Sequence, residues 1–454
     1  MLAALLFVAA TGWVPARWTN PDPHSLELLD GTPINCLLME RVTAEFVRAA
    51  EARGVAVLRV LDASANTEAA FQEIVVAKPS GIVLEGSPGV EIQGRARELA
   101  ASQGWRLIEI LPRAKLRLDV RSRIVATNQG LWPGIRLFEG GAAQAAPTGG
   151  PWVETNAGFL RYLRAATDAE IWMANTPPPK TIIRLQGYQR AIADAATAGA
   201  RWVVALDADF DRRLHARDRE ALADWRRIGT YLRFYEDHAE WRNWRPAGGV
   251  ALIQDEQSGA LLSGGILDMI AVKHVPVRPI PRPRLSPELL RGLRLVINVD
   301  PASLSAADKE VLRGFTRAGG TLLSGPPGWK FPPPREDTVR LDEKDVARLD
   351  EIWREVNSVL GRRNFGARLF NVAGMVSDLL ASPDGKQLLL HLVNYTDYPA
   401  ENITVHVAGR CSNARLLEPG APPRALSPYE IEEGVAVEIE RVATAAALLL
   451  DCMP

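Results

Sequence analysis

The chain has 454 residues, 47% of them hydrophobic, which is long enough for roughly two to four domains with separate cores. Its 53 basic and 54 acidic residues are interspersed and give a formal net charge of −1. No basic stripe appears, so nucleic acids and anionic membranes are disfavoured as partners. The three cysteines form no CxxC pair and the six histidines are scattered, so the usual zinc spacings are absent.

The first 16 residues have features of a signal peptide. Leu2–Ala10 is apolar, and the sequence VPA at 14–16 ahead of Arg17 fits a signal-peptidase site. We expect residues 1–16 to be removed on export, which predicts a secreted or periplasmic protein. The alternative is a buried N-terminal strand or helix. No later segment approaches 18 uninterrupted apolar residues, so we expect no membrane insertion after removal of the signal.

Residues 17–245 alternate between apolar runs and segments of helical periodicity. Regular alternation of this kind is typical of successive βαβ units around a parallel sheet. It predicts an α/β fold, a (β/α)8 TIM-like barrel in which an eighth strand is not placed, with an open doubly wound sheet as the alternative. The seven predicted strands are 34–40, 55–61, 81–86, 106–112, 124–129, 170–176 and 202–207.

A long interval at 130–158 interrupts this pattern. It is rich in glycine and proline, which argues against a regular element. Loops of this length are usually functional or disordered, and Trp132 and Trp152 argue against disorder. We therefore expect the interval to line a binding cleft.

The composition changes after residue 245. Residues 246–330 contain the strands GGVALIQD and LRLVINVD with helices between them, which predicts a small flavodoxin-like α/β domain. Residues 331–368 form a proline-rich linker and a charged helix. From 369 to 454 short strands separated by turns predict an antiparallel β-sandwich. Cys411 and Cys452 either pair in this domain or remain free thiols.

The segment RWVVALDAD at 201–209 ends a predicted barrel strand in two acids. Alternation puts Asp207 and Asp209 on the same face as Val203 and Ala205, whose small side chains suit a barrel interior. Because active sites of such barrels lie at the C-terminal ends of the strands, we expect Asp207 to point into the mouth.

Glu85 ends strand 81–86 on a similarly small-residue face. Counted from residue 34, it closes the third strand, so we expect it to lie across the mouth from Asp207. Glycoside hydrolysis uses two such carboxyl groups, about 5–5.5 Å apart for retention or about 6.5–9.5 Å for inversion. The competing interpretation is that strand-end acids cap the next helix or pair with arginine.

Further polar and aromatic residues are predicted to bind substrate at the rim. Amides and acids suit sugar hydroxyls, and aromatic rings supply flat faces for sugar stacking, although such residues also serve as caps, ion-pair partners and loop anchors. The candidates are Glu40, Asn128, Trp132, Trp152, Glu154, Asn156, Asn175 and Asp209.

The order of barrel, small α/β domain and sandwich, together with GGVALIQD…LRLVINVD…AGGTLLSGP and LHLVNYTD…ITVHVAG…ARLLEP, resembles bacterial β-galactosidase-type glycoside hydrolases. The resemblance implies a class I glutamine-amidotransferase-like second domain, through which homo-oligomers form. That domain has no cysteine here, so it performs no amidotransfer. In the family an Asn-Glu pair ends the fourth strand, whereas the predicted fourth strand here, RLIEILPR, has no such pair at its end. A nucleophilic glutamate closes the seventh strand of the family, and Asp207 stands near that position here. More locally, WPG…APTGGPWVETN…GARWVVALD resembles an uncharacterised family of exported, barrel-containing bacterial proteins.

We therefore predict a glycoside hydrolase-like protein that acts on an oligo- or polysaccharide through Glu85 and Asp207, without cofactor or metal. The alternative is a non-catalytic carbohydrate-binding or scaffold protein on the same fold. A partner-binding role for the C-terminal half is a third hypothesis.

Overall fold

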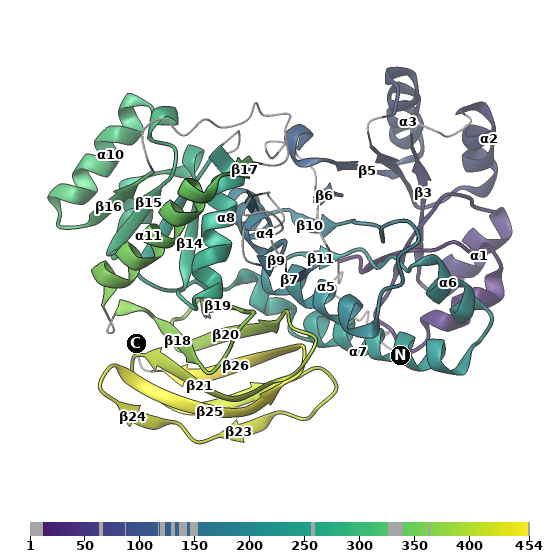
Figure 1. Ribbon diagram of the computed structural model, residues 1–454. Helices are drawn as coiled ribbons and strands as arrows, with labels where there is room; N and C mark the ends of the chain where they lie inside the picture. The colour runs from purple at the N-terminus through teal and green to yellow at the C-terminus, as the bar shows by residue number, and fades with distance from the viewer. Residues whose placement is uncertain are drawn as a thin grey trace, which may run out of the picture.

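The computed structural model describes residues 12–62, 67–86, 88–116, 118, 123–128, 132–135, 143–145, 153–255, 259–325, 339–361 and 364–452. Three parts are visible in Figure 1: a helix-covered barrel in purple to teal, an α/β layer in green, and a sandwich in green to yellow.

Eight parallel strands form a nearly closed barrel in the order β1-β2-β3-β4-β5-β6-β10-β11. Beyond β11, Val204 closes the ring on β1: Arg17 N donates to Val204 O at 2.7 Å, and Val204 N donates to Pro15 O at 3.1 Å. The expected TIM-like barrel is thus confirmed. Its strands are β1 (Pro15–Arg17), β2 (Cys36–Met39), β3 (Ala56–Leu61), β4 (Gly81–Glu85), β5 (Arg106–Leu111), β6 (Ile124–Thr127), β10 (Glu170–Met173) and β11 (Arg201–Trp202).

Strand β1 lies at the predicted signal-peptidase site. Val14 and Ala16 are buried in the core, and Pro15–Arg17 pairs with β2 along its whole length. Cleavage after Ala16 would therefore remove most of a barrel strand, which favours the alternative of a buried N-terminal strand, and the boundary at residue 16 stays a prediction. The alternative of a buried N-terminal strand describes residues 15–17, whereas residues 1–11 lie outside the described residues.

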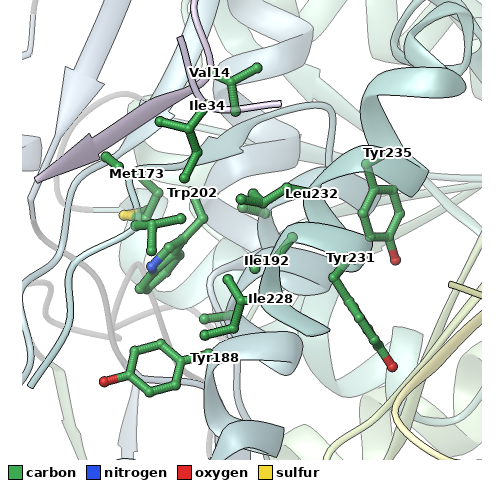
Figure 2. Close-up of a cluster of buried hydrophobic side chains, with 14 of the residues drawn as sticks. Val14, Ile34, Met173, Tyr188, Ile192, Trp202, Ile228, Tyr231, Leu232 and Tyr235 are labelled. Carbon is green, nitrogen blue, oxygen red and sulfur yellow. The ribbon is translucent and has the colours of Figure 1, made fainter. Parts of the chain in front are cut away.

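The barrel interior is a compact apolar cluster that follows the expected alternation. Val83 and Val203 point inward, where the large Trp172 helps to fill the space, while Trp202 and Val204 pack outward. The outer wall packs against helices, as Figure 2 shows for Met173 and Trp202 beside side chains of α5 and α7.

Helices follow most barrel strands, but among the described residues only a short 3-10 turn (Arg113–Lys115) lies between β5 and β6. The excursion between β6 and β10 carries the short strands β7 (Gly134–Ile135), β8 (Ala143–Ala145) and β9 (Val153–Glu154). The helices are α1 (Ala44–Ala52), α2 (Thr67–Ala77), α3 (Val90–Gln103), α4 (Ala157–Ala166), α5 (Leu185–Thr197), α6 (Ala208–His215) and α7 (Arg219–Asp237), with 3-10 turns η1 (Pro23–Leu29) and η3 (Ala239–Asn243).

The middle domain is a parallel sheet in the order β14-β13-β15-β16. Its apolar strands have helices on both faces, as the sequence pattern predicts. Strand β17 (Val339–Leu341) pairs with β8 of the barrel excursion. The elements are β13 (Val250–Gln254), α8 (Gly259–Val272), β14 (Val277–Pro281), η4 (Arg282–Arg284), α9 (Pro287–Leu290), β15 (Leu295–Asn298), η5 (Pro301–Ser303), α10 (Ala306–Arg317), β16 (Thr321–Ser324) and α11 (Glu343–Leu360).

The C-terminal part consists of a six-stranded and a four-stranded antiparallel sheet around a shared apolar core. A disulfide between Cys411 and Cys452 joins two neighbouring strands of the larger sheet. The larger sheet contains β12 (Arg245–Pro246), β19 (Met375–Ala381), β20 (Gln387–Asn394), β26 (Ala445–Cys452), β22 (Cys411–Leu417) and β23 (Arg424–Leu426); the smaller contains β18 (Ala367–Phe370), β21 (Ala400–Ala408), β25 (Gly434–Val442) and β24 (Tyr429–Ile431).

Buried polar contacts fasten the sandwich to the barrel. Asp194 on α5 accepts hydrogen bonds from Thr155 and from Tyr395 of the sandwich. Arg190, also on α5, donates to the carbonyl oxygen of Thr396 at 2.8 Å. These buried hydrogen bonds fix the position of the sandwich relative to the barrel.

Candidate functional site

Because all eight barrel strands are parallel, their C-terminal ends meet on one side of the barrel and form its mouth. Polar side chains occur there at the ends of separate strands. They are Arg17 from β1, Glu40 after β2, Glu85 from β4, Asn128 after β6 and Asn175 after β10.

A bidentate ion pair crosses the mouth. Arg17 Nη1 donates to Glu85 Oε2 at 2.9 Å, and Nη2 donates to Oε1 at 2.5 Å. Nη2 also donates to the carbonyl oxygen of Ala174 at 3.3 Å. Strands β1 and β4 are separated by two other strands, so the pair spans the barrel and does not join neighbours. Both side chains keep limited access to solvent, at 15% and 17% exposure, so an incoming polar group can reach them.

Asn175 follows Ala174 in the same rim. The residue is 4% exposed, and neither its amide oxygen nor its amide nitrogen has a hydrogen-bond partner among the described residues. Buried amides in folded proteins almost always have partners, because an unpaired polar group costs about 1–3 kcal/mol. A group from outside the chain that both donates and accepts would satisfy Asn175.

Asp207 takes a different role from the one its strand position predicts. Its carboxylate caps α6 by accepting from the backbone N–H groups of Asp209 and Phe210 at 3.1 and 3.0 Å. The second oxygen accepts from Ile183 N at 3.1 Å and from the hydroxyl of Tyr188 at 2.8 Å. The residue is 3% exposed. Asp207 therefore stabilises the start of a helix and does not point into an open mouth.

Tyr188 makes this capping arrangement reciprocal. Its hydroxyl accepts from Asp207 N at 2.9 Å while donating to the Asp207 carboxylate. Burial raises the pKa of Tyr188, so the hydroxyl remains a proton donor throughout the physiological range. The sequence interpretation missed this residue because its partner lies 19 positions away.

Two further predicted rim residues are paired with other side chains of the described structure. Asn156 is fully buried and donates from its side chain to Asp194 at 2.8 Å, within the contact between barrel and sandwich. Asp209 lies in the first turn of α6 and pairs with Arg212 and Arg213 of the same helix.

Trp132 anchors its loop. Its indole Nε1 donates to the carbonyl oxygen of Thr176 at 3.2 Å. Its ring lies edge-on to Tyr188 and Trp202, with centroids 5.3 and 5.2 Å apart. These contacts hold the ring against the barrel wall, which corresponds to the anchor interpretation.

The remaining predicted residues have mixed positions. Glu40 is exposed beyond the end of β2, Asn128 is half-buried at the end of β6, and Glu154 is half-buried in the short β9. Trp152 lies outside the described residues. Within the described parts of the chain, no group of three or more His, Cys, Asp or Glu side chains is arranged to hold a metal ion.

The structure also adds Arg17 to the mouth. A strand of three residues beside a predicted cleavage site carries no periodicity by which sequence analysis could recognise it. With β1 included, Glu85 ends the fourth barrel strand, Asn175 follows the seventh and Asp207 follows the eighth. Numbering the strands from residue 34 omits β1, so it gives each of these residues a strand number that is one too low.

Comparisons with solved structures find similarity to glycoside hydrolases. The α-L-fucosidase isoenzyme 2 from Paenibacillus thiaminolyticus aligns over 97% of this chain and 100% of its own, with 11% identity and a TM-score of 0.65. An exo-carrageenase of family GH42 from Bacteroides ovatus aligns over 80% and 55%, with 10% identity and a TM-score of 0.45. A GH42 β-galactosidase from G. stearothermophilus aligns over 90% and 66%, with 10% identity and a TM-score of 0.43.

No protein-family model matches the chain, and no curated protein matches it in sequence. At these identities the likeness to the fucosidase concerns the fold: a glycoside hydrolase-like TIM barrel joined to further domains. Among the described helices, none is both long and apolar enough to cross a membrane.

Proposed function

We propose that this protein binds a carbohydrate at the mouth of its barrel, through Arg17, Glu85 and Asn175. The observation that carries the proposal is the buried Asn175 amide, which has no partner among the described residues. An amide with a free donor and a free acceptor matches a sugar hydroxyl, which both accepts and donates. The bidentate Arg17–Glu85 pair next to it adds charged donors and acceptors at the same rim.

The carboxylates at the mouth favour binding without hydrolysis, because the predicted pair of acids that hydrolysis needs is not available there among the described residues. Hydrolysis of a glycosidic bond generally needs two carboxyl groups on opposite sides of the bond. Asp207 is buried and its two oxygens already accept four hydrogen bonds. In the β-galactosidase-type hydrolases that the sequence resembles, a glutamate closes the seventh strand, whereas here Asn175 occupies that end. An amide cannot serve as the nucleophile.

Hydrolysis is the second candidate, and one observation favours it. Glu85 ends the fourth strand, where the resembled family carries its acid/base glutamate. A second carboxyl group would then have to come from another rim acid, such as Glu40 or Glu154. The two candidates share the same sugar site and differ in whether bonds are broken.

The experiment measures binding of a panel of neutral and acidic oligosaccharides by calorimetry, with release of reducing sugar from the same panel as the second readout. Asn175→Leu should weaken binding about tenfold or more, since it removes direct hydrogen bonds to the ligand. Because the native amide has no described partner, this change should leave stability unchanged or increase it. Asn413→Ala, at an exposed amide of the sandwich, is the matched control.

Wild-type binding without hydrolysis, lost in Asn175→Leu and retained in Asn413→Ala, supports the binding proposal. Hydrolysis that disappears in Glu85→Gln supports the second candidate. If no oligosaccharide binds, or if Asn175→Leu binds as tightly as the wild type, the sugar site at the mouth is refuted.

We further infer that the protein works outside the cytoplasm, either secreted or in the periplasm. The Cys411–Cys452 disulfide supports this, because such bonds persist mainly in oxidising compartments. The amidotransferase-like character of the middle domain and a homo-oligomer formed through it remain predictions.

A further inference from the structure

A cavity of about 630 Å³ lies where the barrel, the middle domain and the sandwich meet. We call it the junction cavity. Its walls come from the C-terminal ends of α4 and α5, from η3, from β14 and η4, and from β19 and β20. The C-terminal ends of barrel helices lead toward the start of the next strand, so this cavity lies on the opposite side of the barrel from the mouth.

Arginine dominates the charge of the junction cavity. Seven arginines and three acids line it, which leaves an excess of positive charge. The three acids already have cationic neighbours, which are Arg161 for Asp378, Arg164 for Asp168 and Arg291 for Glu288.

Three arginines of the lining have no acidic partner. Arg245, Arg278 and Arg284 form no ion pair with any residue that the structure describes. Arg278 is half-buried, its Nε is buried without a hydrogen-bond partner, and burial lowers the pKa of its guanidinium. Arg284 uses one donor, at 2.8 Å from the carbonyl oxygen of Ala165, and a guanidinium has five. Arg278 is thus partly withdrawn from water without a counter-charge, and the exposed Arg245 and Arg284 line the same cavity, so the arrangement favours an anion.

Deeper in the cavity, two almost completely buried side chains also have unused nitrogen atoms. Arg161 is 6% exposed and His391 is 3% exposed, and neither Arg161 Nε nor His391 Nδ1 has a hydrogen-bond partner in the described structure. Arg161 Nε approaches Asp378 Oδ2 only to 3.6 Å. Burial lowers the pKa of His391 to about 3, so its ring is neutral at neutral pH and able to donate a single hydrogen bond.

We propose that the junction cavity binds a small organic molecule that carries a phosphate, sulfate or carboxylate group, held by Arg278 and Arg284. Guanidinium groups bind such oxyanions through paired, charge-assisted hydrogen bonds. The volume lies within the range of about 300–1,000 Å³ that is usual for small-molecule sites, so the cavity holds more than the bare anion. Because all three parts of the chain line the cavity, the ligand would also stabilise their arrangement.

The test is calorimetric titration of the full chain with inorganic phosphate, sulfate, glucose 6-phosphate and glucuronate, with glucose as the neutral probe, at constant ionic strength. In an Asn175→Leu background, which removes the proposed sugar site at the mouth, we expect saturable binding of at least one anion and none of glucose. Arg278→Met and Arg284→Met should each weaken that binding about tenfold or more. The control is Arg226→Met, an exposed arginine on α7 outside the cavity, which should bind as the wild type does.

Comparing the anions shows which anionic group the ligand carries. Tighter binding of glucose 6-phosphate than of phosphate indicates a phosphorylated sugar, whereas preference for glucuronate indicates a carboxylate. Arg284→Met changes an exposed side chain, so it remains informative if Arg278→Met fails to fold. The proposal is refuted if no anion binds saturably at millimolar concentration, or if Arg284→Met binds every anion as the wild type does. The titrations use the Asn175→Leu background, which lacks the proposed sugar site at the mouth, so these readouts report on the junction cavity alone.

Discussion

Replacing Asp207 by alanine tests whether this acid is structural or catalytic. In the structure its carboxylate accepts four hydrogen bonds between 2.8 and 3.1 Å, from three backbone N–H groups and the hydroxyl of Tyr188. The residue is 3% exposed, so water cannot easily replace the lost acceptor. We therefore expect Asp207→Ala to destabilise the barrel strongly.

The magnitude follows from the groups that lose their acceptor. Loss of a helix N-cap costs about 0.5–2 kcal/mol. The Ile183 N–H and the Tyr188 hydroxyl lose the second oxygen, and each buried donor left unpaired costs about 1–3 kcal/mol. We expect about 3–5 kcal/mol for Asp207→Ala after partial relaxation. Asp207→Asn keeps one oxygen as a cap, so about half of that loss is expected.

Urea unfolding followed by circular dichroism measures these losses. Asp218→Ala is the matched control, because Asp218 caps α7 through Ala221 N at 2.9 Å with a side chain that is 40% exposed. It should lose no more than about 1–2 kcal/mol. The reasoning is refuted if Asp207→Ala is no more destabilising than Asp218→Ala and instead abolishes hydrolysis or sugar binding. That result would instead support a functional role for Asp207 at the mouth.

Three further predictions concern stability. Reducing the Cys411–Cys452 disulfide, whose cysteines are 41 positions apart, should destabilise the sandwich by about 3–4 kcal/mol, and unchanged melting with and without reductant would contradict this. Burial lowers the pKa of His274 to about 4, so its neutral form contributes stability that is present above pH 6.5 and is lost as the pH falls toward 4. In His274→Asn the urea midpoint should therefore change less between pH 6.5 and 4 than in the wild type. An equal change in both proteins would show that His274 does not cause the pH dependence. Deleting residues 1–16 should prevent folding because β1 is lost, whereas deleting 1–11 should retain it, with circular dichroism as the readout.

The architecture could be predicted from sequence wherever the elements are long enough to show a period. Strand β3, with six residues, and strand β20, with eight, give clear apolar patterns. Strand β1 has three residues, including a proline, and its pairing with β2 and with Val204 is visible only in three dimensions. Missing that one strand shifted the number of every later strand and so changed which strand ends were compared with the resembled family.

The candidate site was harder to predict because alternation fixes the direction of a side chain but not its partner. Glu85 was expected to face inward, and it meets Arg17, which lies 68 positions away. The positions at which the next helices begin in the structure separate Glu85 from Asp207. Helix α6 begins directly after Asp207, at Ala208, which is the position of an N-cap. Helix α3 begins only at Val90, with Gly89 as its N-cap, so Glu85 is too far from the helix start to cap it. An acid at a strand end that directly precedes a helix is thus expected to cap that helix. An acid followed by a loop keeps its carboxylate free to bind other partners.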